Sequence, residues 1–359
     1  MGKKDNQSTK KEHKSKKDKS DNENKKRRKL HSISKTLKET TSCHSSKNWL
    51  QKFEKATSSR ITKEIRGSRV SIQQQTFSAF IFENYQLEDY TTVKLDKTKF
   101  LDAAMKTEFY KENHDFKIPK IENLEKKKTK ILIIEGDCVD VGIYLKNVLK
   151  TNPTVLNMAS DKNPGGGYRH GSGAQEENLH RRSNLFQCLE DPDNVNPDSI
   201  WDYPIPNYGG IYSPNVCFIR GNEKNGYKFL KEPEYLSIVS VAAIRHPNLS
   251  MDPKSKELLL KEKEIEITKE KIRRMLLISL ENGHNSIVLS AFGCGAFGNP
   301  PNHIAILFRE VIEEFDGYFD VIAFAIFNDH NSGKDHNKKG NVQPFADAFN
   351  QKSIIFEEL

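Results

Sequence analysis

The sequence predicts an α/β protein: a three-layer α/β/α sandwich with a mostly parallel or mixed sheet, an N-terminal helical extension and a disordered basic tail. Two observations favour this fold class. Short, almost continuously apolar runs recur after residue 130, as in strands that are buried on both faces of a sheet. Helix-like stretches separate several of these runs, and such alternation is typical of layered α/β domains.

The basic character of the chain is concentrated in its first residues. The 359 residues carry a formal net charge of +8, and residues 1–29 hold 13 Lys and Arg against 5 Asp and Glu. The remaining residues are therefore formally neutral. The high pI describes the tail, and it does not indicate a nucleic-acid-binding face on the folded part.

Residues 1–45 are rich in Lys, Ser, Asn and Asp and have almost no apolar side chains. Such a segment cannot bury enough surface to offset its ordering entropy, so we expect it to be disordered. Its cluster Lys25–Lys29 (KKRRK) fits a nuclear-import signal, a nonspecific contact with a polyanion, or a solvated tail. In a eukaryote we would expect a nuclear or nucleo-cytoplasmic protein.

The cysteines and the hydropathy of the chain limit the cellular compartments in which we expect the protein. The 5 cysteines are scattered and form no CxxC pair, which favours free thiols in a reducing, intracellular environment. No apolar run approaches the roughly 20 residues that span a bilayer, and no hydrophobic secretory segment is present. We therefore expect no membrane partner, and we expect a monomer.

From Trp49 onward the composition is that of a folded domain, which we place at 46–359 with a helical lead-in at 46–125. Apolar spacing predicts lead-in helices at 46–57, 69–86 and 100–110. Strands are expected at 131–137, 154–159, 235–244, 286–293 and 320–327. Helices are expected between them at 139–150, 176–189, 254–281 and 302–315.

The stretch Val155–Phe186 organises the rest of the chain. It contains three consecutive glycines, Gly165–Gly167, and then Gln175, Glu176 and Glu177 at the start of an expected helix. Consecutive glycines have no packing value and remove side chains where a backbone must approach something closely. Neighbouring glutamates suit the positive end of a helix, and paired carboxylates also perform acid chemistry on glycosidic bonds.

A second glycine cluster, GCGAFGNPP at 293–301, follows an expected strand and precedes an expected helix. Ligands of such sheets bind beyond the carboxyl ends of the strands, and a glycine-rich turn into a helix can hold an anion. The cluster is neither GxGxxG nor a Walker loop. It therefore fits either a phosphate-binding turn or a plain connection.

These residues together resemble the microbial-type poly(ADP-ribose) glycohydrolases. NPGGGYRHGSGAQEE fits that family's GGG-x(6–8)-QEE signature, with seven intervening residues. RRSNL, YPIPNYGGIYSPNV, AFGCGAFGNPP and AFAIF also fit, so the similarity runs from about residue 60 to 350. The resemblance implies a macrodomain-like fold that binds ADP-ribose, which agrees with the alternation of strands and helices.

The resemblance also implies roles for individual residues. Glu177 would be the catalytic acid, Glu176 would position the scissile ribose, and Gln175 would support the loop. Substrate-binding roles would fall to Asn163, Gly165, Gly166, Gly167, Gly293, Gly295, Ala296, Phe297 and Gly298. Of these, the first glycine group would reach the distal ribose and diphosphate, the second would wrap the diphosphate, and Phe297 would form an apolar wall. Other branches have Asn where this chain has Ser160, so a ribose contact there is not expected to be shared.

Cleavage of the ribose–ribose bond needs a proton on the leaving 2′ oxygen, and one carboxyl group can serve as acid and then as base for water. No cofactor and no metal are needed, and His170, His180, His246, His284 and His303 lack ligand spacing. We expect them to be surface or hydrogen-bonded residues. The expected function is exo-acting hydrolysis of poly(ADP-ribose) on ADP-ribosylated proteins, with release of ADP-ribose.

Three alternatives remain open from the sequence. The first is an ADP-ribose-binding reader module without catalysis, which needs the glycine loops but not two glutamates. The second is a hydrolase of mono-ADP-ribosyl linkages. In the third, the glycines form a flexible loop and the glutamates are solvated residues at a helix start.

Overall fold

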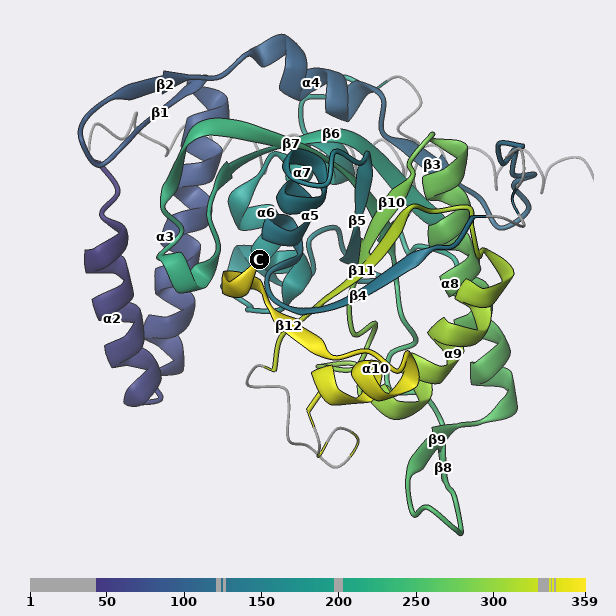
Figure 1. The fold of residues 1–359 in the computed structure, drawn as a ribbon. Coiled ribbons are helices and arrows are strands. Elements are labelled where there is room, and N and C mark those ends of the chain that lie inside the picture. Colours follow the sequence, from purple (N-terminus) through teal and green to yellow (C-terminus); the bar gives the residue numbers. More distant parts are fainter. Residues whose placement is uncertain are drawn as a thin grey trace, which may run out of the picture.

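A central eight-stranded sheet organises the computed structural model, which describes residues 43–120, 124, 127–196, 203–328, 336, 338 and 340–359. The expected disordered tail up to residue 42, with its KKRRK cluster, lies outside the described residues. The strand order is β12-β4-β11-β10-β5-β7-β6-β3 (Figure 1). The strands are β3 (Glu108–Tyr110), β4 (Lys130–Glu135), β5 (Pro153–Met158), β6 (Gly210–Arg220), β7 (Phe229–Val241), β10 (Ser286–Leu289), β11 (Val321–Ile326) and β12 (Ser353–Ile355).

The sheet is mixed, with a parallel majority. Parallel pairing joins β12, β4, β11, β10, β5 and β7, whereas β6 pairs antiparallel with β7 and with β3. All residues of β10 and β11 are buried, as are five of the six in β5. Continuous burial is expected where helices cover both faces of a parallel sheet, and the predicted fold class is confirmed.

Two helical layers cover the sheet (Figure 1). Alternate strand residues face opposite layers: Ile133 and Leu156 pack in one core, and Ile134 and Val155 in the other. The first layer consists of α8 (Glu262–Glu281), α9 (Pro301–Glu314) and α10 (Val342–Ala348). The second consists of α5 (Cys138–Asn147), α6 (Gln175–Arg182) and α7 (Leu185–Glu190), with α4 (Lys97–Met105) beside them.

The N-terminal extension is helical, as expected. It comprises α2 (Ser46–Ser58), α3 (Thr62–Ile81) and the hairpin of β1 (Asn84–Gln86) and β2 (Thr92–Lys94). Helix α3 packs on α6, so the extension lies directly behind the glutamate pair. Contacts begin before the expected start at residue 46, because His44 is buried and its Nε2 lies 2.8 Å from the Gly226 carbonyl.

Several expected boundaries were wrong. The helix expected at 176–189 is two helices, because Ser183 is extended (φ −147°, ψ 176°) and pairs with Phe218 of β6. The helix expected at 254–281 begins only at Glu262, after the hairpin of β8 (Leu249–Met251) and β9 (Leu258–Leu260). The helices expected at 69–86 and 100–110 end at Ile81 and Met105, and each is followed by a short strand.

Strand β6 was not expected at all. Its sequence carries Pro214 and Asn215 in mid-strand, and Asn215 has φ 46°. The register with β7 shifts between Ser213 and Val216, so these two residues form a bulge that the ladder accommodates. Long pairing with β7 therefore overrides a local signal that favours a turn.

Candidate active site

A cavity of about 400 Å³ opens at the carboxyl ends of the parallel strands. Its lining includes Asp137 after β4, Met158 at the end of β5, Ser290 after β10 and Phe327 after β11. All of these strands run in the same direction, so their ends meet at one edge of the sheet. This is the edge at which ligands of open α/β sheets bind.

The residues that the sequence singled out fall into two adjoining groups. Those that line the cavity are Gln175, Gly293, Gly295, Ala296 and Phe297. Those that do not line it are Asn163, Gly165, Gly166, Gly167, Glu176, Glu177 and Gly298. Since Gln175 lines the cavity and opens α6, the glutamate pair directly after it lies at the cavity's margin.

Backbone amides of the glycine loop hold both carboxylates of the pair. Glu176 accepts hydrogen bonds from the amides of Ser160 (2.7 Å) and Gly165 (3.1 Å), one on each oxygen. Glu177 accepts one on Oε1, from the amide of Gly167 at 2.9 Å. The sequence predicted glycines for close approach to a ligand; in the structure, their amides enclose the two glutamates.

The backbone at Gly166 can only be formed by glycine without rearrangement. Its φ is 55°, in the left-handed region, and a Cβ there would lie 2.7 Å from Glu177 Oε1 and 3.1 Å from Glu176 Oε2. The turn is closed by a hydrogen bond from the Gly166 amide to the Asn163 carbonyl, 3.0 Å. Asn163 therefore shapes the loop through its backbone.

The pair is shielded from water, with Glu176 4% and Glu177 8% exposed. Burial raises the pKa of Glu176 well above its usual range; the amide hydrogen bond from Ser160 opposes this, and the charge of Glu177 adds to it. This raised pKa favours the protonated form of Glu176. This electrostatic arrangement is typical of acid–base sites.

Gln175 joins the start of α6 to the end of β5. Its Oε1 accepts from the Met158 amide at 2.8 Å, and its Nε2 donates to the Leu156 carbonyl at 2.6 Å. The side chain thus replaces the partner that a neighbouring strand would offer. This contact fixes the position from which both glutamates project.

A network of buried cations behind α6 was not anticipated. The fully buried Arg181 donates to the Ser172 carbonyl at 2.7 Å and to the Tyr227 hydroxyl at 3.0 Å. That hydroxyl in turn donates to Glu223 at 3.0 Å, and Glu223 forms a bidentate pair with Arg69. The network therefore ties the loop before α6 to the turn η3 (Glu223–Asn225).

A second ion pair anchors the cavity's lining. Arg182 is fully buried and donates to Asp137 at 2.7 Å and to Asp140 at 3.2 Å. Asp137 also caps α5 by accepting from the Val139 amide. The motif RRSNL was the only sequence signal for these two arginines, and it gave no indication that they are buried.

The histidines lie as the sequence predicted. His170 and His246 are exposed, and His303 accepts from the Leu260 amide at 2.9 Å. His180 and His284 are buried and hydrogen-bonded to backbone carbonyls, and burial lowers their pKa values to about 3 and about 4. Within the described residues no group of three or more His, Cys, Asp and Glu side chains could hold a metal ion, and no helix is long and apolar enough to cross a membrane.

Comparison with known families gives the arrangement its context. Residues 73–221 match the family model described as "Microbial-type PARG, catalytic domain". The match contains the glycine loop, Gln175 and both glutamates. Over this segment the chain resembles the catalytic domain of the microbial-type poly(ADP-ribose) glycohydrolases. The expected glycosidase activity, hydrolysis of poly(ADP-ribose), is the activity of this family. No curated protein matches the chain.

Solved glycohydrolase structures share the fold. The chain is 23% identical to poly(ADP-ribose) glycohydrolase from Thermomonospora curvata. The superposition has a TM-score of 0.61 and covers 79% of this chain and 100% of the Thermomonospora protein. The same enzyme bound to the inhibitor ADP-HPD is 24% identical and superposes with a TM-score of 0.58, over 79% of this chain and 99% of that one. The Deinococcus radiodurans enzyme in complex with ADP-ribose is 24% identical and superposes with a TM-score of 0.54, over 72% of this chain and 98% of that one. These likenesses confirm the macrodomain-like sandwich.

Proposed function

We propose that the protein is an exo-acting poly(ADP-ribose) glycohydrolase in which Glu177 is the general acid and base and Glu176 positions the scissile ribose. The observation that carries the proposal is the buried glutamate pair, held by the amides of the glycine loop at the margin of the cavity. A reader module needs the cavity but has no use for two buried carboxylates held by the same loop. Burying unneeded charge is costly.

The hydrogen bonds support different roles for the two glutamates. Both oxygens of Glu176 are engaged by amides, so this side chain is fixed in place. Glu177 uses only Oε1, and among the described residues nothing donates a hydrogen bond to its Oε2. A proton donor needs a free oxygen that can reach the leaving group, and Oε2 of Glu177 is the candidate for it.

The chemistry follows from this geometry. Glu177 Oε2 would protonate the 2′ oxygen of the leaving adenosine ribose as the glycosidic bond breaks and an oxocarbenium-like ribose forms. Glu176, through its contact with the same loop, would orient that ribose. The Glu177 carboxylate would then take a proton from the attacking water, which restores the acid and releases ADP-ribose.

The ligand would be one ADP-ribose unit of the polymer on a modified protein. Gly293, Gly295 and Ala296 line the cavity where a diphosphate could lie against backbone amides, and Phe297 offers an apolar wall. The ADP-ribose complex of the Deinococcus radiodurans enzyme supports this class of ligand. Asn163, Gly165, Gly167 and Gly298 would shape the loops around it.

The test is a pair of glutamine substitutions. Glu177→Gln keeps shape but cannot cycle a proton, so turnover of poly(ADP-ribose) should fall by at least about three orders of magnitude. ADP-ribose affinity, measured by calorimetry, should change much less. Glu176→Gln should mainly impair substrate positioning, and Glu262→Gln, at the exposed start of α8, serves as a charge-matched control.

Each alternative has its own outcome. Reversed effects in the two variants would exchange their roles, and two active variants would rule out the glutamate mechanism. Wild type that binds ADP-ribose but cleaves no polymer would be a reader. Product from mono-ADP-ribosylated protein alone would identify a mono-ADP-ribosyl hydrolase.

For the tail, we propose nuclear import through Lys25–Lys29 if the source is a eukaryote. Alanine replacement of all five residues in a fluorescent fusion should then redistribute the protein. An unchanged distribution would leave a solvated segment or a nonspecific polyanion contact. We further propose that the protein is a monomer, which light scattering tests directly.

A further inference from the structure

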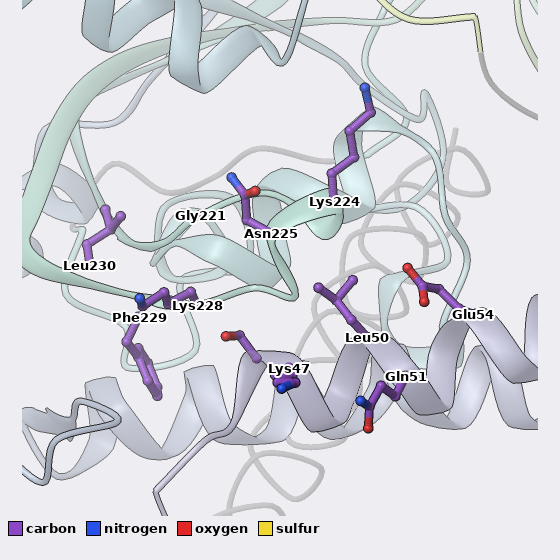
Figure 2. Close-up of a pocket in the computed structure, with 11 residues that line it drawn as sticks. Lys47, Leu50, Gln51, Glu54, Gly221, Lys224, Asn225, Lys228, Phe229 and Leu230 are labelled. Carbon is purple, nitrogen blue, oxygen red and sulfur yellow. The ribbon is translucent and has the colours of Figure 1, made fainter. Parts of the chain in front are cut away.

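An open groove of about 580 Å³ lies between α2 and the turn that leads from η3 into β7 (Figure 2). We call it the lysine groove and define it by Lys47, Leu50, Lys224, Asn225, Lys228 and Phe229. Figure 2 shows Lys47 and Leu50 on the helix and the other four on the opposite segment. None of the site residues expected from the sequence lies in it.

Lys224 connects the lysine groove to the cavity, because it lines both. Its Nζ lies 4.5 Å from the ring centroid of Phe327, which also lines the cavity. The preceding residue, Glu223, forms an ion pair with Arg69. The charge of Glu177 is one of the effects that raise the pKa of the Arg69 guanidinium. The groove and the cavity therefore adjoin at Lys224, the residue that their linings share.

The charge of the groove favours a phosphate-bearing ligand. Three lysines line it, against one carboxylate, that of Glu54. Glu88, outside the lining, accepts from the amide and hydroxyl of Ser46 at 2.7 and 2.6 Å. It remains charged, and its Oε2 lies 3.8 Å from Lys228 Nζ, so it offsets part of that lysine's charge and leaves the groove with a net positive charge. Leu50 and Phe229 add apolar surface, which suits a nucleoside better than a free phosphate.

We propose that the lysine groove binds the diphosphate of a second ADP-ribose unit while the first unit occupies the cavity. The inference rests on the proposed function, because it takes the polymer as the ligand. The chain's own tail is a poor occupant, since residues 1–29 carry a net charge of +8 and the lysines would repel them. A unit joined covalently to the first gains from the high effective concentration of tethered sites.

The test reverses two charges that line the groove but not the cavity. In Lys47→Glu/Lys228→Glu, KM for long poly(ADP-ribose) should rise about tenfold, because exposed charge pairs contribute modestly and two charges are reversed. The turnover number and the Kd for free ADP-ribose should not change. The matched control is Lys52→Glu/Lys55→Glu, the same charge change at exposed positions of α2 outside the groove.

The outcomes separate this inference from the proposed function. Equal KM values for the groove and control variants overturn the second-unit site while leaving the enzyme intact. If the wild type cleaves no polymer, both proposals fall together. If an RNA oligonucleotide competes with polymer in wild type but not in the groove variant, the groove is a nucleic-acid site and the inference is wrong. Lys47→Ala/Lys228→Ala, which should raise KM about threefold, replaces the reversal if that variant does not fold.

Discussion

Gly166→Ala tests whether the glycine loop exists to enclose the glutamates. The added Cβ would lie 2.7 Å from Glu177 Oε1, closer than real Cβ contacts, so the carboxylate or the loop must shift. The Gly167 amide, which holds that same oxygen at 2.9 Å, would move with the loop. The substitution therefore displaces the proposed acid without removing any functional group.

Two effects contribute, and they can be separated. An alanine at φ 55° costs about 1–2 kcal/mol of backbone strain, which lowers the free energy of unfolding. The steric shift acts on catalysis instead. A misplacement of about 1 Å in an active site can cost about 10²-fold in rate, and the shift here is smaller, so we expect turnover to fall about 10- to 100-fold.

Gly283→Ala is the matched control. Gly283 also has a positive φ, 73°, but a Cβ there would meet no atom within 4 Å. It should lose about the same 1–2 kcal/mol of stability and retain wild-type turnover. The assay compares release of ADP-ribose from polymer with urea unfolding for both variants.

Two results would refute the reasoning. Normal turnover in a folded Gly166→Ala protein would mean that the loop tolerates a side chain and does not constrain Glu177. Equal loss of turnover in both variants would mean that general destabilisation, not the position of the carboxylate, limits the rate.

Three further predictions concern the surroundings of the site. Removal of residues 1–42 should leave activity unchanged, whereas removal of 1–45 should lower the melting temperature, because it deletes the buried His44; equal melting temperatures would contradict this. Burial holds the pKa of His284 near 4, below 6.5 in the unfolded chain, so its contribution to stability is present above pH 6.5 and is lost as pH falls, by about 1.4 kcal/mol per pH unit. His284→Gln should remove this one-proton dependence of the free energy of unfolding on pH, which urea unfolding from pH 5 to 8 can measure. Arg181→Lys should lower turnover more than ADP-ribose affinity, because lysine cannot bond both the loop before α6 and Tyr227; an unchanged pH–rate profile and turnover would show that the arginine only packs.

The local pattern of apolar residues was sufficient to predict the parallel strands at the centre of the sheet. Strands β5, β10 and β11 are buried on both faces almost throughout, and β4 is buried at Ile133 and Ile134, so their apolar runs are continuous and visible in the sequence. The glycine loop and the QEE motif were visible for a similar reason. Their unusual composition reflects a local backbone requirement, and the cavity does form beside them.

What the sequence did not reveal depends on partners far along the chain. Strand β6 exists because β7 pairs with it, although Pro214 and Asn215 favour a turn. The helix expected at 176–189 breaks because Ser183 pairs with Phe218, 35 positions later, as the Asn184 amide donates to the Cys217 carbonyl. Such pairings outweigh local propensity.

The site itself shows the same division. The sequence placed Glu176 and Glu177 side by side at a helix start, but only the folded loop decides which carboxylate oxygen remains free. Arg181 reads as a surface charge on a polar helix, yet it is buried because Ser172 and Tyr227 supply its acceptors. Charge can be buried only where tertiary structure provides hydrogen-bond partners. For that reason the sequence could single out the two glutamates, but only the fold determined their environment.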